Sequence, residues 1–184
     1  MKKVLSVILA VFLIAAVTAC SQEKGPNTIK DGKKLQDVIA AVDERFSEQY
    51  GDGYRAVMMP MEVDELYLTD FVSIDITLLD EFAGAVSMSM TNSDAFFGLK
   101  IKEGNMESIK AAIEKYREDL IAQYERYPVN GSFERAKTSV IYQKGDYLFF
   151  IGVGIMPSNP QVESLDFSGD VAMVKTAIDS MFNV

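Results

Sequence analysis

Histidine is absent from this chain of 184 residues, and cysteine occurs once, at Cys20. Without histidine the protein lacks the commonest general base and the commonest metal ligand, so any catalysis would depend on carboxylates, lysine, tyrosine, serine or threonine. Without a second cysteine no intrachain disulfide can form, and packing alone must stabilise the fold. We therefore expect neither a metal site nor a cofactor.

Positive charge is also scarce. The chain has 18 lysine and arginine residues against 27 aspartate and glutamate residues, which gives a formal net charge of −9. Nucleic acids and anionic lipid surfaces select proteins with patches of lysine and arginine, so we expect neither as a partner. The length suits a single core and is short for two domains, and we expect a monomer.

The first 19 residues have the three parts of an export signal. Lys2 and Lys3 are positively charged, the run from Val4 to Val17 carries no charge, and small residues precede Cys20. A transmembrane helix needs about 20 apolar residues. The run is therefore too short to span a membrane, and we expect the segment to be cleaved off as a signal peptide.

The single cysteine ends a four-residue motif that follows the apolar run. Val17-Thr18-Ala19-Cys20 resembles the lipobox of bacterial lipoproteins, in which the thiol receives a diacylglyceryl group and the cysteine becomes the mature N-terminus. A lone cysteine after an ordinary signal peptide is the alternative. Because two acyl chains anchor a protein stably, the resemblance implies a lipid anchor at Cys20 on the extracytoplasmic face of the cell membrane. Residues 20–32 would form a flexible tether, and residues 33–184 the globular domain.

Three amphipathic helices are predicted from apolar residues that recur every three or four positions. The first begins at Leu35 and stops near Gly51, the second runs from an N-cap at Asn105 to Pro128, and the third follows Ser168. The stretches "DELYLTDF" and "DITLLDEF" are expected to form short helical turns.

Two β-hairpins are predicted from alternating polarity and turn residues. The first pairs "GAVSMSM" with "DAFFGLKIK", and the second pairs "SVIYQ" with "YLFFIGVGI" around Lys144-Gly145-Asp146. The strand from Tyr147 to Ile151 is apolar on both faces and should be central or covered. The pattern predicts an α+β fold, with an antiparallel sheet of about four strands packed with amphipathic helices in a single two-layer domain.

The order of these elements carries a resemblance. The block "TNSDAFFGLKIKEGNMESIKAAIEKYREDLIAQYERYP" through "AKTSVIYQKGDYLFFI" resembles bacterial lipoproteins that carry domain of unknown function 4358. The similarity covers much of residues 35–155 and lies in the succession of strand, long charged helix and Lys-Gly-Asp-Tyr hairpin. It implies an extracytoplasmic lipoprotein, and it brings no known activity or site residues.

Three patterns resemble catalytic or metal sites, but for each of them a structural interpretation is favoured. Ser21 to Lys24 matches the S-x-x-K motif of penicillin-binding proteins, but these residues fall in the predicted tether, where nothing would hold a reactive geometry. Adjacent acidic pairs such as Asp64-Glu65 point apart and favour a solvated surface. Five methionines could supply a copper site, yet core packing is the favoured interpretation because Met88 and Met90 share a predicted strand face with Val86.

Two classes of function remain. We favour a non-catalytic binding or interaction module at the cell surface with an unknown protein or cell-envelope partner. The alternatives are a carboxylate-dependent cell-wall or glycan hydrolase, which needs two facing carboxylates, and a small solute-binding lipoprotein. The connections "PVNGSFERAKT" and "PSNPQVESLDF" should be neighbours at one end of the sheet, and long loops often bind ligands. The candidate binding residues are Tyr127, Asn130, Phe133, Arg135, Asn159 and Gln161.

Overall fold

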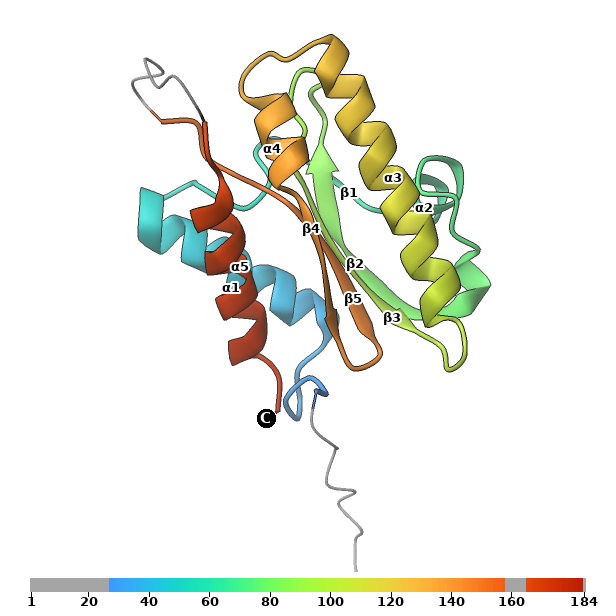
Figure 1. The fold of residues 1–184 in the computed structure, drawn as a ribbon. Coiled ribbons are helices and arrows are strands. Elements are labelled where there is room, and N and C mark those ends of the chain that lie inside the picture. Colours follow the sequence, from blue (N-terminus) through green and yellow to red (C-terminus); the bar gives the residue numbers. More distant parts are fainter. Residues whose placement is uncertain (1–26, 158–164, 184) are drawn as a thin grey trace, which may run out of the picture.

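The fold is built around one antiparallel sheet with the strand order β1-β2-β3-β5-β4 (Figure 1). The computed structural model describes residues 27–157 and 165–183. The strands are β1 Pro60–Glu62, β2 Leu79–Ser87, β3 Ala95–Ile101, β4 Val140–Lys144 and β5 Tyr147–Gly152. The helices are α1 Leu35–Tyr50, α2 Glu65–Asp70, α3 Met106–Arg126, α4 Ser132–Thr138 and α5 Ser168–Ser180, with a 3₁₀ turn η1 at Ile76–Leu78.

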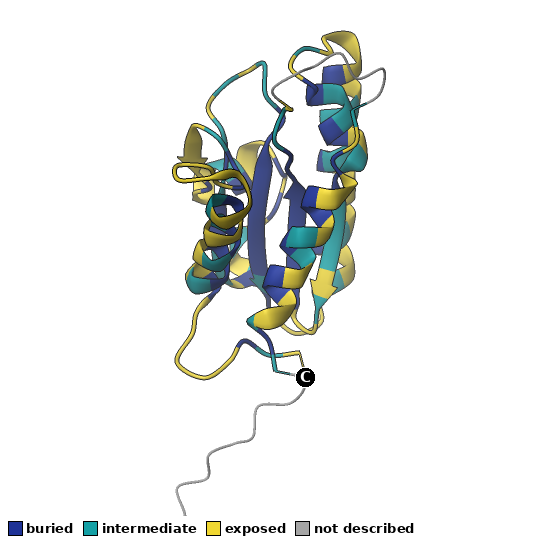
Figure 2. Ribbon diagram, turned by 90° about the vertical axis from the view of Figure 1, so that its left-hand side faces the viewer, coloured by how far each residue is buried: buried dark blue, intermediate teal, exposed yellow. Residues whose placement is uncertain are grey.

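The two central strands, β3 and β5, carry large apolar side chains on both of their faces. Phe96 and Phe149 pack with α1 and α5, whereas Phe97 and Phe150 pack with α2 and α3. Figure 2 shows these buried strands between helices on either side. The domain is therefore α+β as predicted, with helices on both faces and three layers in place of the two predicted.

Both predicted hairpins are present, as β2–β3 and β4–β5. The first begins earlier than predicted, because "DITLLDEF" is helical only at Ile76–Leu78 and enters β2 at Leu79. Strand β1 adds a fifth strand to the four predicted. Its three residues are all exposed, so the sequence there has no alternation of buried and exposed positions from which a strand could be predicted.

The predicted burial of Met88 and Met90 is wrong. Strand β2 ends at Ser87, and the two methionines beyond it are 65% and 86% exposed. The sequence continues to alternate after Val86, but the backbone has left the sheet, so the alternation no longer places side chains against the core.

The connection at residues 128–138 is only partly a loop, which corrects the prediction. Helix α4 occupies Ser132–Thr138 and buries Arg135 and Ala136. Its seven residues are too few to show helical periodicity clearly. It begins after Gly131, whose φ of 66° lies in the left-handed region, and a Cβ there would lie 2.9 Å from Cδ1 of Leu165 in the second connection. The two long connections are thus neighbours in space.

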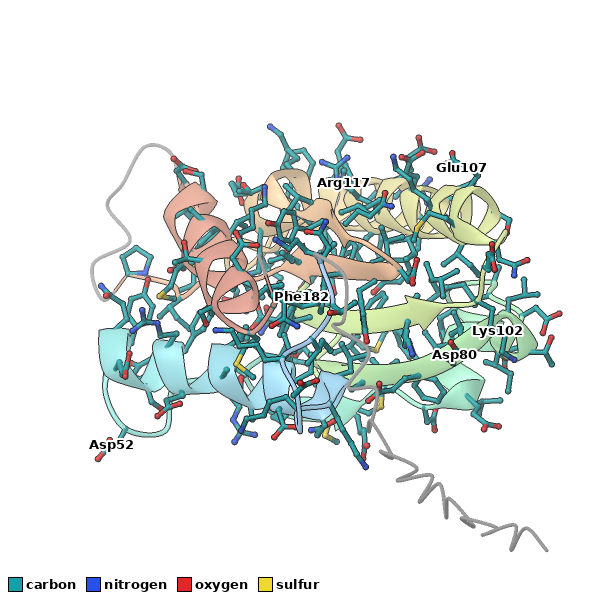
Figure 3. The ribbon with its side chains drawn as sticks, turned by 90° about the horizontal axis from the view of Figure 1, so that it is seen from below. Asp52, Asp80, Lys102, Glu107, Arg117 and Phe182 are labelled. Atoms are coloured by element: carbon teal, nitrogen blue, oxygen red, sulfur yellow. The ribbon has the colours of Figure 1, made fainter. Side chains whose placement is uncertain are left out.

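The ends of the described chain are joined at the opposite end of the sheet. Ile29 forms an antiparallel bridge with Phe182, and the Asn27 amide donates to the Asn183 carbonyl at 3.0 Å. Asn27 also lies beside Gly145 in the β4–β5 turn (Figure 1, lower end). Figure 3 looks onto this end, where Phe182 is labelled. The β2–β3 connection and α4 lie a strand length away, roughly 20 Å.

Candidate functional site

A cavity of about 540 Å³ opens beside α2, α3 and the β2–β3 connection, at the end of the sheet away from Asn27. Three methionines line it, Met61 from β1 and Met88 and Met90 from the connection. All three are exposed, as is Phe71, which also lines the cavity. We call this cavity the methionine groove.

Three tyrosines in the groove lining are fixed to the rest of the fold. The hydroxyls of Tyr67 and Tyr116 share a hydrogen bond of 2.8 Å, and the Tyr124 hydroxyl donates to the Asn92 carbonyl at 2.9 Å. The Tyr116 ring also packs edge-on against Phe150 in the core. Burial raises the pKa of all three tyrosines, so their hydroxyls are protonated at neutral pH.

Hydrogen bonds position the β2–β3 connection, which carries Met88 and Met90. The Met88 amide donates to the Met59 carbonyl at 3.0 Å, and the Ser87 amide donates to the Asp94 carbonyl at 2.8 Å. Within the connection the hydroxyls of Ser89 and Thr91 share a bond of 2.9 Å. The exposure of Met88 and Met90 is therefore a property of an ordered connection.

The groove is acidic. Its titratable lining consists, besides the tyrosines, of Asp70, Asp94 and Asp119, with no lysine or arginine. Asp119 pairs with Lys115 one helical turn away. The surrounding sequence has the same bias, since residues 56–99 contain eight acidic residues and no lysine or arginine. This segregation of charge is visible in the sequence alone and is the signal from which the groove could have been predicted.

Asp94 forms a buried ion pair with Arg135 of α4. Arginine Nε lies 2.7 Å from Oδ1, and the two side chains are 3% and 2% exposed for Arg135 and Asp94. Asn92 joins them, because its amide donates to Asp94 Oδ2 at 2.8 Å and its carbonyl oxygen accepts from Arg135 Nη1 at 2.9 Å. Burial raises the pKa of Asp94, and the charge of Arg135 opposes the rise.

A second cavity of about 340 Å³ adjoins the groove and shares Ser89, Asn92 and Asp94 with it. Asn130 and Arg135 also line it. Asn130 is exposed with a φ of 53°, in the left-handed region. Two residues predicted from the sequence therefore meet at this end of the sheet.

The other predicted binding residues lie elsewhere. Tyr127 is the exposed C-cap of α3 and lines neither cavity. Phe133 is half-buried on α4, with Lys137 Nζ 5.0 Å from its ring centroid. Asn159 and Gln161 lie outside the described residues, as does Cys20.

The structure describes residues 27–157 and 165–183. In those ranges no group of three or more histidine, cysteine, aspartate or glutamate side chains is arranged to hold a metal ion. No helix there combines the length and hydropathy required to cross a membrane.

The sequence profile of one protein family matches residues 55–152, from the segment before β1 to the end of β5. The match includes every residue that lines the methionine groove, together with Asp94 and Arg135, whereas α1 and α5 lie outside it. No curated protein and no solved structure matches the chain. Because the matched segment spans more than half of its residues, the chain belongs to the family of domain of unknown function 4358 (DUF4358).

Proposed function

We propose that this protein is a lipid-anchored extracytoplasmic lipoprotein that acts as a non-catalytic binding module through the methionine groove. The observation that carries the proposal is the exposed apolar lining of that groove. Met61, Met88, Met90 and Phe71 gather around one cavity. Contiguous exposed apolar side chains beside polar ones are typical of interaction sites, and methionine adapts its shape to different partners.

The position of the groove fits a tethered protein. The described chain begins at Asn27 beside the β4–β5 turn, and the groove lies at the other end of the sheet. Seven residues, from Cys20 to Pro26, would join the anchor to the domain, a reach of at most about 25 Å. Anchored in this way, the domain would present the groove away from the bilayer, toward partners in the cell envelope.

Binding is better supported than hydrolysis. A glycan hydrolase needs two carboxylates that reach the substrate. Of the three in the groove, Asp94 is almost fully buried against Arg135 and Asp119 pairs with Lys115, which leaves only Asp70 unpaired. A small solute-binding lipoprotein fits the volume of the groove, but a small solute would not require exposed methionines on its rim.

The anchor is tested by mass spectrometry of the wild-type chain and of Cys20→Ser, both isolated from membranes. We expect the wild type to start at Cys20 and to carry a diacylglyceryl group. The variant should keep its first 19 residues and lack the lipid. A wild-type chain that starts elsewhere and carries no lipid would refute the anchor.

The binding surface is tested by placing a photo-crosslinking amino acid at Met88 or Met90 in intact cells. The matched control is Gln143, which is also exposed but lies on β4 near the β4–β5 turn. Crosslinks to another molecule should form from the groove positions and not from Gln143. No crosslinks from the groove would show that it is not the binding surface.

A further inference from the structure

We infer that the methionine groove receives a basic amphipathic segment of a partner protein, with apolar side chains on the methionines and lysine or arginine side chains on the surrounding carboxylates. This inference rests on the proposed binding function and names the chemistry of its partner. It follows from three properties of the same surface, which are its charge, its apolar lining and its shape.

The charge selects a cation. Asp70 of α2 lines the groove, is exposed, and has no ion-pair partner among the described residues. Asp119 of α3 also lines the groove and is exposed, with Lys115 as its pair on the same helix, and no lysine or arginine of the described chain lines the groove. Like charges close together repel, and a basic partner relieves that repulsion while its association is accelerated.

The lining selects apolar side chains as well. Unbranched thioether side chains fill irregular gaps, which suits a groove that accepts leucine or isoleucine from a segment. The exposed Phe71 ring, stacked on Tyr67 at 5.2 Å, offers a face to a guanidinium or ammonium group. A purely polar polycation would leave the methionine side chains exposed to water, and an anionic lipid would be repelled by the carboxylates.

The size of the groove suits a few side chains of one segment. A volume of about 540 Å³ lies within the range of pockets that enclose ligands of modest size. Amphipathic helices place such side chains every three or four residues along one face, and they bind apolar grooves in that way. The fixed tyrosines give this segment a rigid surface, and the methionines adjust to it.

The experiment uses the full chain in phosphatidylcholine nanodiscs, with empty nanodiscs as the blank. The first probe is a fluorescent lysine–leucine amphipathic peptide of ~14 residues, near the length at which isolated helices become stable. The second replaces every lysine with glutamate, and the third is spermidine. Anisotropy should show binding of the lysine peptide only, weakened at least about tenfold between 0.1 and 0.5 M salt.

Charge variants locate the contact. Asp70→Asn with Asp119→Asn should weaken binding of the lysine peptide about fivefold or more. The matched control, Asp52→Asn with Glu107→Gln, removes the same charge from exposed positions outside the groove and should change affinity less than about twofold. Both residues are labelled in Figure 3. Equal losses in the two variants would show nonspecific attraction and overturn the inference.

Apolar variants test the second half of the inference. Met88→Ser with Met90→Ser should weaken binding about tenfold, whereas Leu66→Ser, on an exposed leucine of α2 outside the groove lining, should leave it nearly unchanged. Equal binding of the glutamate peptide, or spermidine binding as tight as that of the lysine peptide, would overturn the inference. If crosslinks still form at Met88 in cells, the proposed binding function stands even when the lysine peptide fails.

Discussion

Arg135 and Asp94 face each other behind the methionine groove, with Nε of the arginine 2.7 Å from Oδ1 of the aspartate. The same guanidinium donates two hydrogen bonds, at 3.0 and 2.8 Å, to the Gly154 carbonyl. This one side chain therefore connects α4, the start of β3 and the segment that leaves β5. The surface at this end of the sheet depends on a buried ion pair.

Removing one partner of this pair should be costly. Arg135→Met would leave the Asp94 carboxylate and the Gly154 carbonyl buried without the guanidinium, and we expect a loss of about 3–5 kcal/mol in the free energy of unfolding. The double variant Arg135→Met with Asp94→Leu should recover part of that loss. Urea unfolding measures both. A single-variant loss below about 1 kcal/mol would show that the pair is not structurally important.

The exposed methionines should contribute little to stability. Met88→Ser with Met90→Ser should change the free energy of unfolding by about 0.5 kcal/mol or less, because neither side chain packs in the core. As a comparison, Ile113→Ala on α3 removes a fully buried side chain and should cost about 2–5 kcal/mol. Thermal melts distinguish the cases. A large loss of stability in the methionine double variant would indicate that these side chains pack in the core.

Two glycine substitutions should have opposite effects. A Cβ at Gly98 of β3 would lie 2.7 Å from the Phe149 ring and 2.9 Å from Leu35 Cδ1, so Gly98→Ala should destabilise the fold by about 1–3 kcal/mol. Gly169 in α5 has no neighbouring atom within 4 Å, and Gly169→Ala should stabilise by up to about 1 kcal/mol. Urea midpoints measured side by side give the signs, and destabilisation by both would contradict the prediction.

Tyr142 should lose its proton at a higher pH than an unperturbed tyrosine does. Partial burial and its 2.6 Å hydrogen bond to Asp179 raise the pKa of Tyr142 to about 12. The folded state thus favours the protonated phenol, so its contribution to stability is present below about pH 10 and lost as pH rises through 12. Ultraviolet titration of the wild type against Tyr142→Phe isolates this group. Asp179→Asn should lower the pKa of Tyr142 toward 10, and an unchanged value would contradict the assigned cause.

Long periodic elements were predictable from the sequence. Helix α3 and the hairpin at Lys144-Gly145-Asp146 are confirmed close to their predicted bounds, because many residues repeat one pattern. Among the short elements, α2 and the turn η1 fall within the predicted helical turns, but β1 and α4 were not predicted. β1 is only three residues long and α4 only seven, so tertiary contacts and not local sequence patterns decide their structure.

The groove could not be assembled from local patterns. It brings together Asp70, Met88 and Asp119, which are far apart in sequence and meet only when α2, the β2–β3 connection and α3 are placed. Connectivity did predict that the two long connections are neighbours. Extending the strand alternation beyond Ser87 put Met88 and Met90 in the core and concealed the groove lining.

The bridge between Ile29 and Phe182 has a mechanical consequence. Any load applied through the chain ahead of Asn27 meets first the short run of hydrogen bonds that joins residues 27–30 to residues 181–183. These few bonds lie outside the five-stranded sheet, and their rupture would free the residues before α1. The segment from Asn27 to α1 would then extend by roughly 25 Å. The junction would therefore break under force before the strands beneath the groove bear any load.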